Sequence, residues 1–479
     1  MDISAKKVFS SFSWVALISY ANRFLGFVTT LILAKFLDPK DFGLVAIASM
    51  VIEVLKIFKD LGLSEALIYK KEQIEEASNT AYFLIVGFHI VLFILASIVS
   101  HFAGNFYNNS LVMPIIIVMS SNLVWDSLRA IPRALLRKNI EFKKLVMPEV
   151  LPVLVASVVS LVMAFTGFGV WSLVVRTVLH SILGMILLGR IYPYKPTFNF
   201  NIGIAKELFH YGKFIMATSM MLVILYNIDK FYVSKFSGIE FLGFYELAMR
   251  ISDLPVKELS HVIGSVMFPV FSKMNNKLDQ FKNAFMTTLK YVCTISIPMS
   301  LGISIYGPYL VTRIYGEKWI PLSKPLQILA LYALFRSMSS IIHDAFKALG
   351  RPEYMQKYVF VKLLLISILG IPSLKFFNLE GICYLIVLVY AFTFIFEVIT
   401  LSELISFKFS ELVRTIFNPL LLSIILIPGI FVSFKFIFLK LELHTIFFSI
   451  FLTILTYFFI LIKLDKSIVL NFKKLIVTN

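Results

Sequence analysis

Four charged side chains near the middle of the chain are spaced as one stripe along a helix. They are Glu246, Arg250, Asp253 and Lys257, at i, i+4, i+7 and i+11, and about 100° per residue places them on one helical face. The surrounding sequence is apolar, and a charge near the centre of a bilayer costs roughly 2.5–3.5 kcal/mol on insertion scales. Two interpretations follow: a ladder of ion pairs that fixes helix packing, or the wall of a water-filled substrate path.

Further arginines lie inside apolar segments. Arg23 and Arg336 fall midway along their expected helices, and Arg176 shares a helix face with His180. The guanidinium group is always charged and holds phosphate through two parallel hydrogen bonds, which suits an anionic lipid-diphosphate headgroup. We therefore predict that Arg23, Arg176 and Arg336 bind substrate. The alternative is that each arginine pairs with a local carboxylate or a backbone carbonyl.

Acidic residues inside apolar segments are candidates for ion coupling. They are Glu53, Asp126, Asp229 and Glu397. A carboxylate in a membrane helix can carry a proton or bind a cation such as Na⁺. Each of them can equally be the counter-ion of a nearby arginine, and the sequence leaves this alternative open.

The sequence gives no sign of a metal site, a cofactor or a catalytic centre. His89, His261 and His343 lack the spacing of metal ligands, and Cys293 and Cys383 both fall in apolar segments, so neither a metal pair nor a disulfide framework is indicated. There is no glycine-rich phosphate loop, nucleotide motif, or pair of nucleophile and base. We therefore expect a protein that is not an enzyme and needs no cofactor.

The composition is that of a membrane protein. Of 479 residues, 59% are hydrophobic and only 15% are charged, against roughly 25% charged residues in soluble proteins. The formal net charge of +17 is explained by basic loops on anionic lipid headgroups, because nucleic-acid-binding motifs are absent. The first apolar run is too long for a signal peptide and lacks a cleavage site, so we expect it to remain as a membrane span.

Apolar stretches long enough to cross a bilayer core of about 30 Å recur along the whole chain. They predict an all-α integral membrane protein with about fourteen transmembrane helices. The expected helices cover residues 12–34, 43–63, 80–100, 111–131, 146–166, 170–190, 212–234, 242–268, 285–305, 325–347, 357–375, 380–402, 413–434 and 444–462.

Basic residues are distributed unequally between the expected loops. Five of them lie between residues 133 and 144, whereas loops 101–110 and 166–169 contain no Lys or Arg. All loops together give roughly 25 basic residues on one side and roughly 9 on the other. Both termini are therefore predicted to be cytoplasmic. The longest outer loop, 306–324, is too short for the chemistry of a membrane-embedded polymerase or ligase.

The sequence resembles itself at a nearly constant offset, which indicates an internal repeat. The repeat predicts two parallel six-helix lobes, 1–200 and 201–405, followed by two extra helices and a tail over 406–479. The offset is 200 near the start, 214 after Arg133 and 212 after Gly169. At offset 200, Ser19, Leu25, Lys35, Phe36, Gly43 and Ala48 match Ser219, Leu225, Lys235, Phe236, Gly243 and Ala248. Parallel repeats suit a transporter that rocks one bundle against the other.

Several short segments together resemble one transporter family, the Wzx-type polysaccharide flippases of the multidrug/oligosaccharidyl-lipid/polysaccharide superfamily. The resemblance covers about residues 10–360. Its segments are 31–69, Ile131-Pro-Arg-Ala-Leu-Leu-Arg-Lys, Gly167-Phe-Gly-Val-Trp-Ser-Leu, Asn227-Ile-Asp-Lys, Leu242-Gly-Phe-Tyr, Ala248-Met-Arg250, Tyr315-Gly-Glu-Lys-Trp and Ala348-Leu-Gly-Arg-Pro.

The resemblance implies that undecaprenyl-diphosphate-linked oligosaccharides are flipped across the bacterial inner membrane by alternating access. It further implies a cationic cavity, coupling to an H⁺ or Na⁺ gradient, and work alongside other polysaccharide-assembly membrane proteins. Carried over by position, Asp229 and Arg250 become substrate-binding candidates, although Glu246 beside Arg250 departs from a purely cationic stripe. The alternatives are a drug exporter of the same superfamily, which needs an acidic cavity, and a membrane-embedded polymerase or glycosyltransferase.

Overall fold

In the computed structural model of the chain, residues 5–56, 67, 73–139, 141–197, 201–203, 220–437 and 442–464 are described. All regular elements in these ranges are helices. The chain divides into two compact units, Met1–Gly243 and Phe244–Asn479, and each is treated by itself. The expected division into 1–200, 201–405 and 406–479 stays a prediction.

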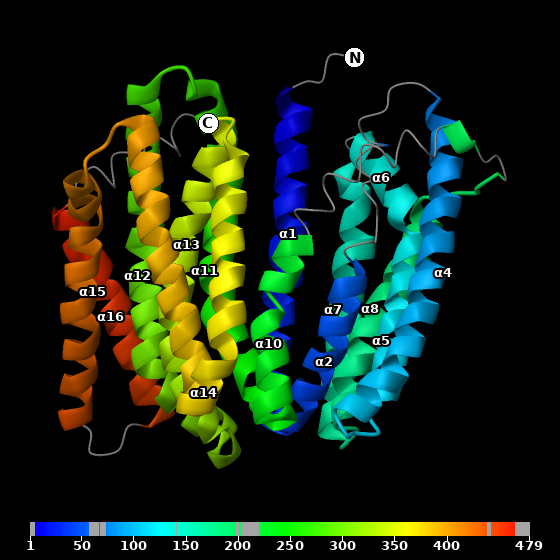
Figure 1. Cartoon of the computed structure of the whole chain (residues 1–479), viewed down its shortest axis with the longest axis horizontal. Coiled ribbons are helices and arrows are strands. Elements are labelled where there is room, and N and C mark those ends of the chain that lie inside the picture. The colour runs from blue at the N-terminus through cyan, green and yellow to red at the C-terminus, as the bar shows by residue number, and fades with distance from the viewer. Residues whose placement is uncertain are drawn as a thin grey trace. The chain divides into compact units, whose positions relative to one another are not determined.

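The first unit is built from long helices that run beside one another (Figure 1). The tightest neighbours are α4 with α5, α7 with α8, and α1 with α7. Its elements are α1 (Ala5–Phe36), α2 (Pro39–Lys56), α4 (Ile74–Phe106), α5 (Val112–Leu128), α6 (Ala130–Lys138), α7 (Phe142–Phe165), α8 (Val170–Ile191), α10 (Ile228–Tyr232) and the π-helical turn η1 (Val233–Ser237).

The second unit has the same all-helical construction (Figure 1). Helix α13 packs between α12 and α14, and α15 lies against α12 and α16. Its elements are α11 (Ile239–Met274), which begins in the last residues of the first unit, α12 (Leu278–Tyr315), the 3₁₀ helix η2 (Glu317–Leu322), α13 (Ser323–Ala348), α14 (Pro352–Ile405), α15 (Phe409–Ile437) and α16 (Leu443–Leu464).

Among the described residues, eight helices are long and apolar enough to cross a membrane, and α5 is a shorter apolar helix. Large apolar side chains such as Phe376, Leu388 and Phe451 are more than half exposed. Water would disfavour so much exposed apolar surface, so these faces are suited to lipid. The prediction of an all-α, multi-pass membrane protein is therefore confirmed, and the number fourteen stays a prediction.

Helix α14 contains two of the predicted spans. Its 54 residues would measure about 80 Å as one straight helix, far more than a bilayer core of about 30 Å. The backbone leaves helical geometry at Phe377 (φ −131°, ψ 17°) and Asn378 (φ 52°, ψ −145°). A Cβ at Gly381 would overlap the carbonyl of Ser373, so this glycine lets the chain reverse tightly. The break separates the expected helices 357–375 and 380–402.

The predicted outer loop 306–324 is wrong. Helix α12 continues to Tyr315, and η2 follows from Glu317 to Leu322. The turn is closed by Gly316 (φ 84°), whose conformation favours glycine, and by the buried Trp319. The residues expected to form a loop thus extend one helix and cap the next.

Two glycines allow a backbone contact between the starts of α2 and α11. A Cβ on Gly43 would overlap the carbonyl of Ile239, and a Cβ on Gly243 would overlap the carbonyl of Pro39. Residues 239 and 243 follow residues 39 and 43 by 200 positions, the offset of the internal repeat. The same contact is therefore made twice with the roles exchanged, as expected for pseudo-symmetric halves, and glycine is what permits so close an approach.

We predict that Gly243→Ala destabilises the protein by about 1–3 kcal/mol, because the added methyl group meets a backbone carbonyl that cannot rotate away. Thermal unfolding of the detergent-purified protein measures this as a lower midpoint. Gly87→Ala on α4 is the matched control, since nothing lies within 4 Å of its Cβ position, and it should match or exceed wild type. Equal midpoints for the two variants would contradict the tight crossing.

Candidate functional site

The charge stripe on α11 forms ion pairs. Arg250 Nη2 lies 3.5 Å from Glu246 Oε1, and the Arg250 side chain is 42% exposed. Asp253 forms an ion pair with Arg336 of α13, and both side chains are largely buried. The side chain of Lys257 lies outside the described residues. These contacts match the ion-pair ladder, and the Arg250 side chain is exposed as well as paired.

A buried cluster of three ionisable groups surrounds Glu397 in the second half of α14. Glu397 is fully buried, and its Oε1 accepts hydrogen bonds from Lys362 Nζ at 2.8 Å and from His343 Nε2 at 3.0 Å. Lys362, in the first half of α14, is 2% exposed, whereas the His343 side chain on α13 is 16% exposed. Glu397 and His343 are singled out by their sequence positions, but Lys362 was missed. Its signal is a single lysine in the middle of an apolar span.

Aromatic rings connect this cluster with the Arg336–Asp253 pair. The Lys362 ammonium lies 4.7 Å from the ring centre of Tyr390, which packs edge-on against Tyr332 at 4.7 Å. The Arg336 guanidinium carbon is 6.0 Å from the Tyr332 ring. Both tyrosines are at most 5% exposed. The predicted residues Glu397 and Arg336 are therefore connected through Lys362 and two tyrosines, which the sequence pattern did not indicate.

In the first unit, Arg176 connects two helices through neutral groups. Its Nη2 donates to the carbonyl of Gly26 at 2.9 Å, and its Nη1 donates to Thr30 Oγ1 at 3.2 Å. Both acceptors belong to α1, so Arg176 fastens α8 to α1. Arg23, also on α1, is partly buried. Arg176 therefore has a backbone carbonyl partner, which was the alternative to substrate binding.

Acidic candidates of the first unit also have specific partners. Glu53 Oε2 accepts a hydrogen bond from Asn227 Nδ2 at 2.9 Å, which links α2 to the residue before α10. Asp229 is 3% exposed on α10. Asp126 pairs with Arg129, whose Nη2 lies 2.7 Å from Asp126 Oδ1. Asp126 is thus the counter-ion of a nearby arginine, one of the two roles left open by the sequence, whereas Glu53 accepts its hydrogen bond from the neutral amide of Asn227.

A small cavity of about 90 Å³ lies beside Arg129 in the first unit, lined also by Tyr82, Tyr192 and Tyr194. Burial raises the pKa of Tyr194 to about 12, so its hydroxyl remains protonated near neutral pH. That hydroxyl donates to Asn79 Oδ1 at 2.9 Å, and this bond attaches the segment after α8 to the start of α4. The cavity therefore lies where this hydrogen bond holds the segment after α8 against α4.

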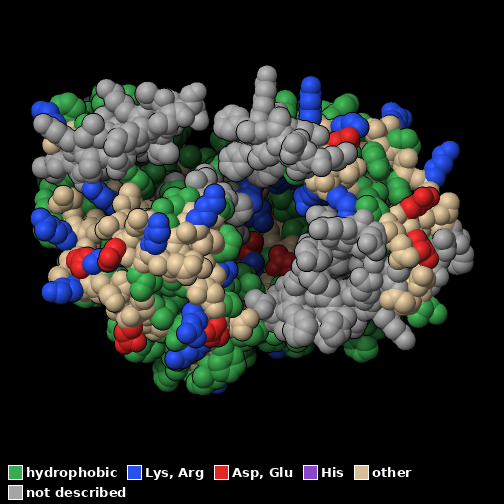
Figure 2. Space-filling model, turned by 90° about the horizontal axis from the view of Figure 1, so that it is seen from above, with side chains coloured by type: hydrophobic (Ala, Val, Ile, Leu, Met, Phe, Trp, Pro, Cys, Tyr) green, Lys and Arg blue, Asp and Glu red, His purple; other side chains and the backbone are tan. Residues whose placement is uncertain are grey.

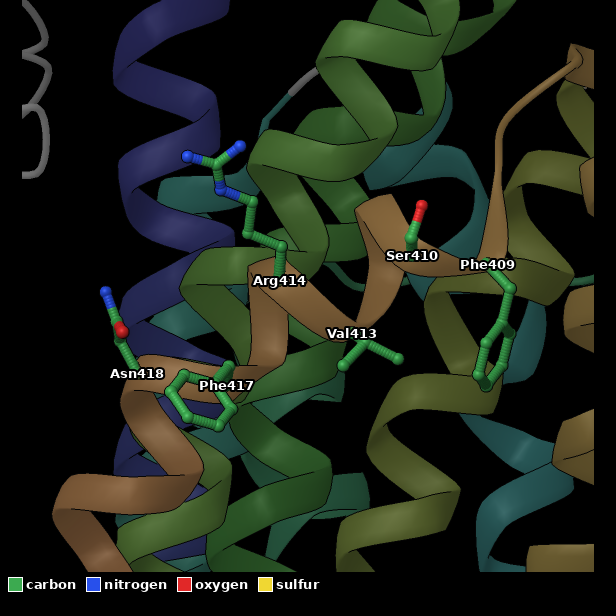
Figure 3. Close-up of a pocket in the computed structure, with 6 residues that line it drawn as sticks. All are labelled: Phe409, Ser410, Val413, Arg414, Phe417 and Asn418. Carbon is green, nitrogen blue, oxygen red and sulfur yellow. The ribbon is translucent and has the colours of Figure 1, made fainter.

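A larger open pocket of about 670 Å³ lies along the first turns of α15 (Figure 3). Its described lining consists of Phe409, Ser410, Val413, Arg414, Phe417 and Asn418. Arg414 and Asn418 extend to the same side of the helix, away from Phe409 (Figure 3). The surface combines one cation with polar and aromatic groups at the end of an apolar helix.

Comparison with known proteins finds similar sequences among polysaccharide biosynthesis proteins. The chain is 27% identical over 362 residues to lipopolysaccharide biosynthesis protein WzxC of Escherichia coli, covering 74% of this chain and 72% of that protein. It is 22% identical over 370 residues to teichuronic acid biosynthesis protein TuaB of Bacillus subtilis, covering 77% of each.

The fold is similar to that of the lipid II flippase MurJ in its inward closed conformation, with a TM-score of 0.78, 16% identity, and coverage of 95% of this chain and 99% of that one. This likeness confirms the predicted fold class. The family model described as polysaccharide biosynthesis protein matches residues 32–324. That match covers more than half of the chain and confirms the resemblance, so the chain belongs to the polysaccharide biosynthesis protein family.

Proposed function

We propose that the protein is a flippase that moves undecaprenyl-diphosphate-linked oligosaccharide units across the bacterial inner membrane by alternating access. The observation that carries the proposal is the set of arginines held in ion pairs inside an otherwise apolar helical protein, above all Arg250 and Arg336. Guanidinium groups recognise diphosphate through paired hydrogen bonds. Membership of the polysaccharide biosynthesis family and a fold similar to that of a lipid II flippase support the same substrate class.

The ion pairs suggest how the diphosphate is bound and released. In the described structure Arg250 and Arg336 each already have a carboxylate partner. A diphosphate that reaches either arginine shares or replaces that carboxylate, so an ion-paired arginine is never left alone in a medium of low dielectric constant. Release restores the internal pair. We propose Arg23, Arg176 and Asp229 as further substrate-binding residues, all three in the first unit.

Transport without chemistry is the simplest role for this set of residues. An embedded polymerase or glycosyltransferase would need an outer loop, and the segment 306–324 is largely helical. A drug exporter would need unpaired acidic groups for a cationic ligand, whereas Asp253 and Glu397 hold basic partners. We therefore propose a transporter that is not an enzyme and that works with other polysaccharide-assembly membrane proteins.

The protein is proposed to lie with both termini in the cytoplasm. Lys and Arg side chains are spread over the end of the molecule at which α6 lies, where Asp and Glu side chains are fewer (Figure 2). Basic loops favour the cytoplasmic side. Arg414, in the pocket of α15, is placed to meet anionic membrane lipid, because its neighbours can rest against acyl chains.

We further propose that an ion gradient drives flipping. The acidic candidates are Glu53, Asp126 and Glu397. Of these, Glu397 is the most buried and has the most basic partners, which makes it the best placed to convert a change of charge into movement.

Removing the Arg336 charge should stop transport. Arg336→Ala alone leaves the partly buried Asp253 carboxylate without this partner and should lower the free energy of unfolding by about 3–5 kcal/mol. The decisive variant is therefore Arg336→Gln with Asp253→Asn, which removes both charges. We expect a flipping rate at least about tenfold lower for an isoprenoid-diphosphate-linked oligosaccharide in proteoliposomes, with a wild-type unfolding midpoint.

Arg351→Ala is the matched control, because Arg351 pairs with Glu353 on the exposed start of α14, and it should transport normally. Full transport by the Arg336→Gln/Asp253→Asn variant would make this pair a packing element and remove it from the substrate path.

The orientation can be tested with two exposed asparagines, since both native cysteines are buried. Asn108 lies between α4 and α5, and Asn139 follows α6. We expect an impermeant maleimide to label Asn108→Cys in intact cells and to label Asn139→Cys only after permeabilisation, because the basic loop is cytoplasmic. The reverse labelling pattern would invert the topology.

A further inference from the structure

The cluster around Glu397 holds two basic groups on one carboxylate oxygen. Lys362 Nζ and His343 Nε2 both approach Oε1, at 2.8 and 3.0 Å. The other oxygen, Oε2, is buried and has no hydrogen-bond partner among the described residues. With the ammonium charged, the carboxylate ionised and the imidazole neutral, the cluster is electrically neutral. A proton on His343 would make it cationic.

Lys362 disfavours a sodium ion at this carboxylate, because two cations would then share one buried anion. A hard cation is held by several oxygen ligands, but Oε1 is already occupied by two nitrogen donors. Nearby hydroxyl groups are engaged as well: Thr393 donates to the carbonyls of Val389 and Tyr390, and Tyr358 hydrogen-bonds Thr400 at 2.5 Å. The Lys362 ammonium thus already supplies a positive charge beside Glu397.

We propose, on the basis of the proposed transport function, that the His343–Glu397–Lys362 cluster is the coupling site, and that it carries a proton and excludes sodium. His343 is the carrier, because an imidazole side chain can exchange a proton with water. The His343 side chain is also the most exposed of the three. It accepts a proton from water on one side of the membrane and becomes imidazolium. It returns that proton to water on the other side, while Lys362 stays beside Glu397.

Other titratable groups on the neighbouring helices have contacts of their own. On α13, Asp344 pairs with Lys347, 2.6 Å from its Oδ1, and Arg336 pairs with Asp253. On α14, Tyr358 and Tyr390 surround the cluster as neutral rings. On α12, the buried Cys293 belongs to the same core as Tyr358 and Phe394. His343 is thus the imidazole that directly contacts the Glu397 carboxylate.

The position of the cluster gives its charge a direct effect on substrate binding. Through Tyr390 and Tyr332, Lys362 is connected with the Arg336–Asp253 pair. Protonation of His343 competes with Lys362 for Oε1 and would alter the contact of the ammonium with Tyr390. A change at the proton site can thereby shift the pairing of Arg336, where the diphosphate is proposed to bind.

The first test needs no substrate. Thermal unfolding midpoints of the purified protein are compared in NaCl and choline chloride at equal ionic strength. Wild type should show no difference. Lys362→Met should be stabilised by NaCl alone, with a rise of a few degrees, because removal of the ammonium leaves a buried carboxylate to which sodium can bind.

Three variants keep this test decisive. Lys375→Met on the exposed part of α14 controls for loss of a lysine. Lys362→Met with Glu397→Gln removes both charges and should lose the sodium response, and Lys362→Arg retains a cation if Lys362→Met fails to fold. A sodium response of wild type that Glu397→Gln abolishes, or no response of Lys362→Met, would overturn the proposal.

The second test uses proteoliposomes and an isoprenoid-diphosphate-linked oligosaccharide. A pH gradient should accelerate flipping by wild type, and a sodium gradient should not. His343→Gln keeps a hydrogen bond to Glu397 but cannot carry a proton, so the acceleration by a pH gradient, measured against the variant's own rate without a gradient, should fall by about tenfold or more. Wild-type acceleration by sodium, or pH-driven flipping by His343→Gln at the wild-type rate, would reject the proton carrier. Absence of any flipping by wild type would instead reject the proposed function and leave the sodium test valid.

Discussion

The cost of placing charge in a hydrocarbon medium is the constraint on which this structure depends. In the described part of the second unit, Arg336 pairs with Asp253, Arg250 with Glu246, and Lys362 with Glu397. A buried charge without a partner costs several kcal/mol. The Arg336–Asp253 pair therefore joins α13 to α11, and the Lys362–Glu397 pair joins the two halves of α14, whereas Arg250 and Glu246 pair within α11. The charges that give the protein its chemistry are therefore also the ones that fix its packing.

Pairing also determines what kind of transporter these residues can build. A fixed cationic cavity would hold a diphosphate tightly and release it slowly, whereas an arginine with an internal carboxylate exchanges one anion for another. The free energy of the two states then differs little, which alternating access requires if neither side of the membrane is to trap the substrate. The proposed coupling site works in a similar way, since one proton on His343 changes the net charge of the His343–Glu397–Lys362 cluster.

The helical spans were predictable from the sequence because the bilayer sets the length of an apolar segment. The predicted span 444–462 corresponds to Leu443–Leu464, and 325–347 corresponds to Ser323–Ala348. The loop 306–324 was wrong because Tyr306, Val311 and Tyr315 are buried by other helices, and hydropathy alone does not register such packing. The break at Phe377 and Asn378 lay between two expected spans, but its backbone geometry was not foreseeable.

By itself, the sequence determined that the protein spans a membrane and which positions carry rare charges, because these properties are local along the chain. Tertiary structure alone decided the partners: Asp253 meets Arg336 across 83 positions, and Glu397 meets Lys362 across 35. It also revealed that Gly43 and Gly243 lie where two backbones touch and a Cβ would overlap a carbonyl. Contact between distant residues depends on how helices pack, and no periodicity within one helix encodes it.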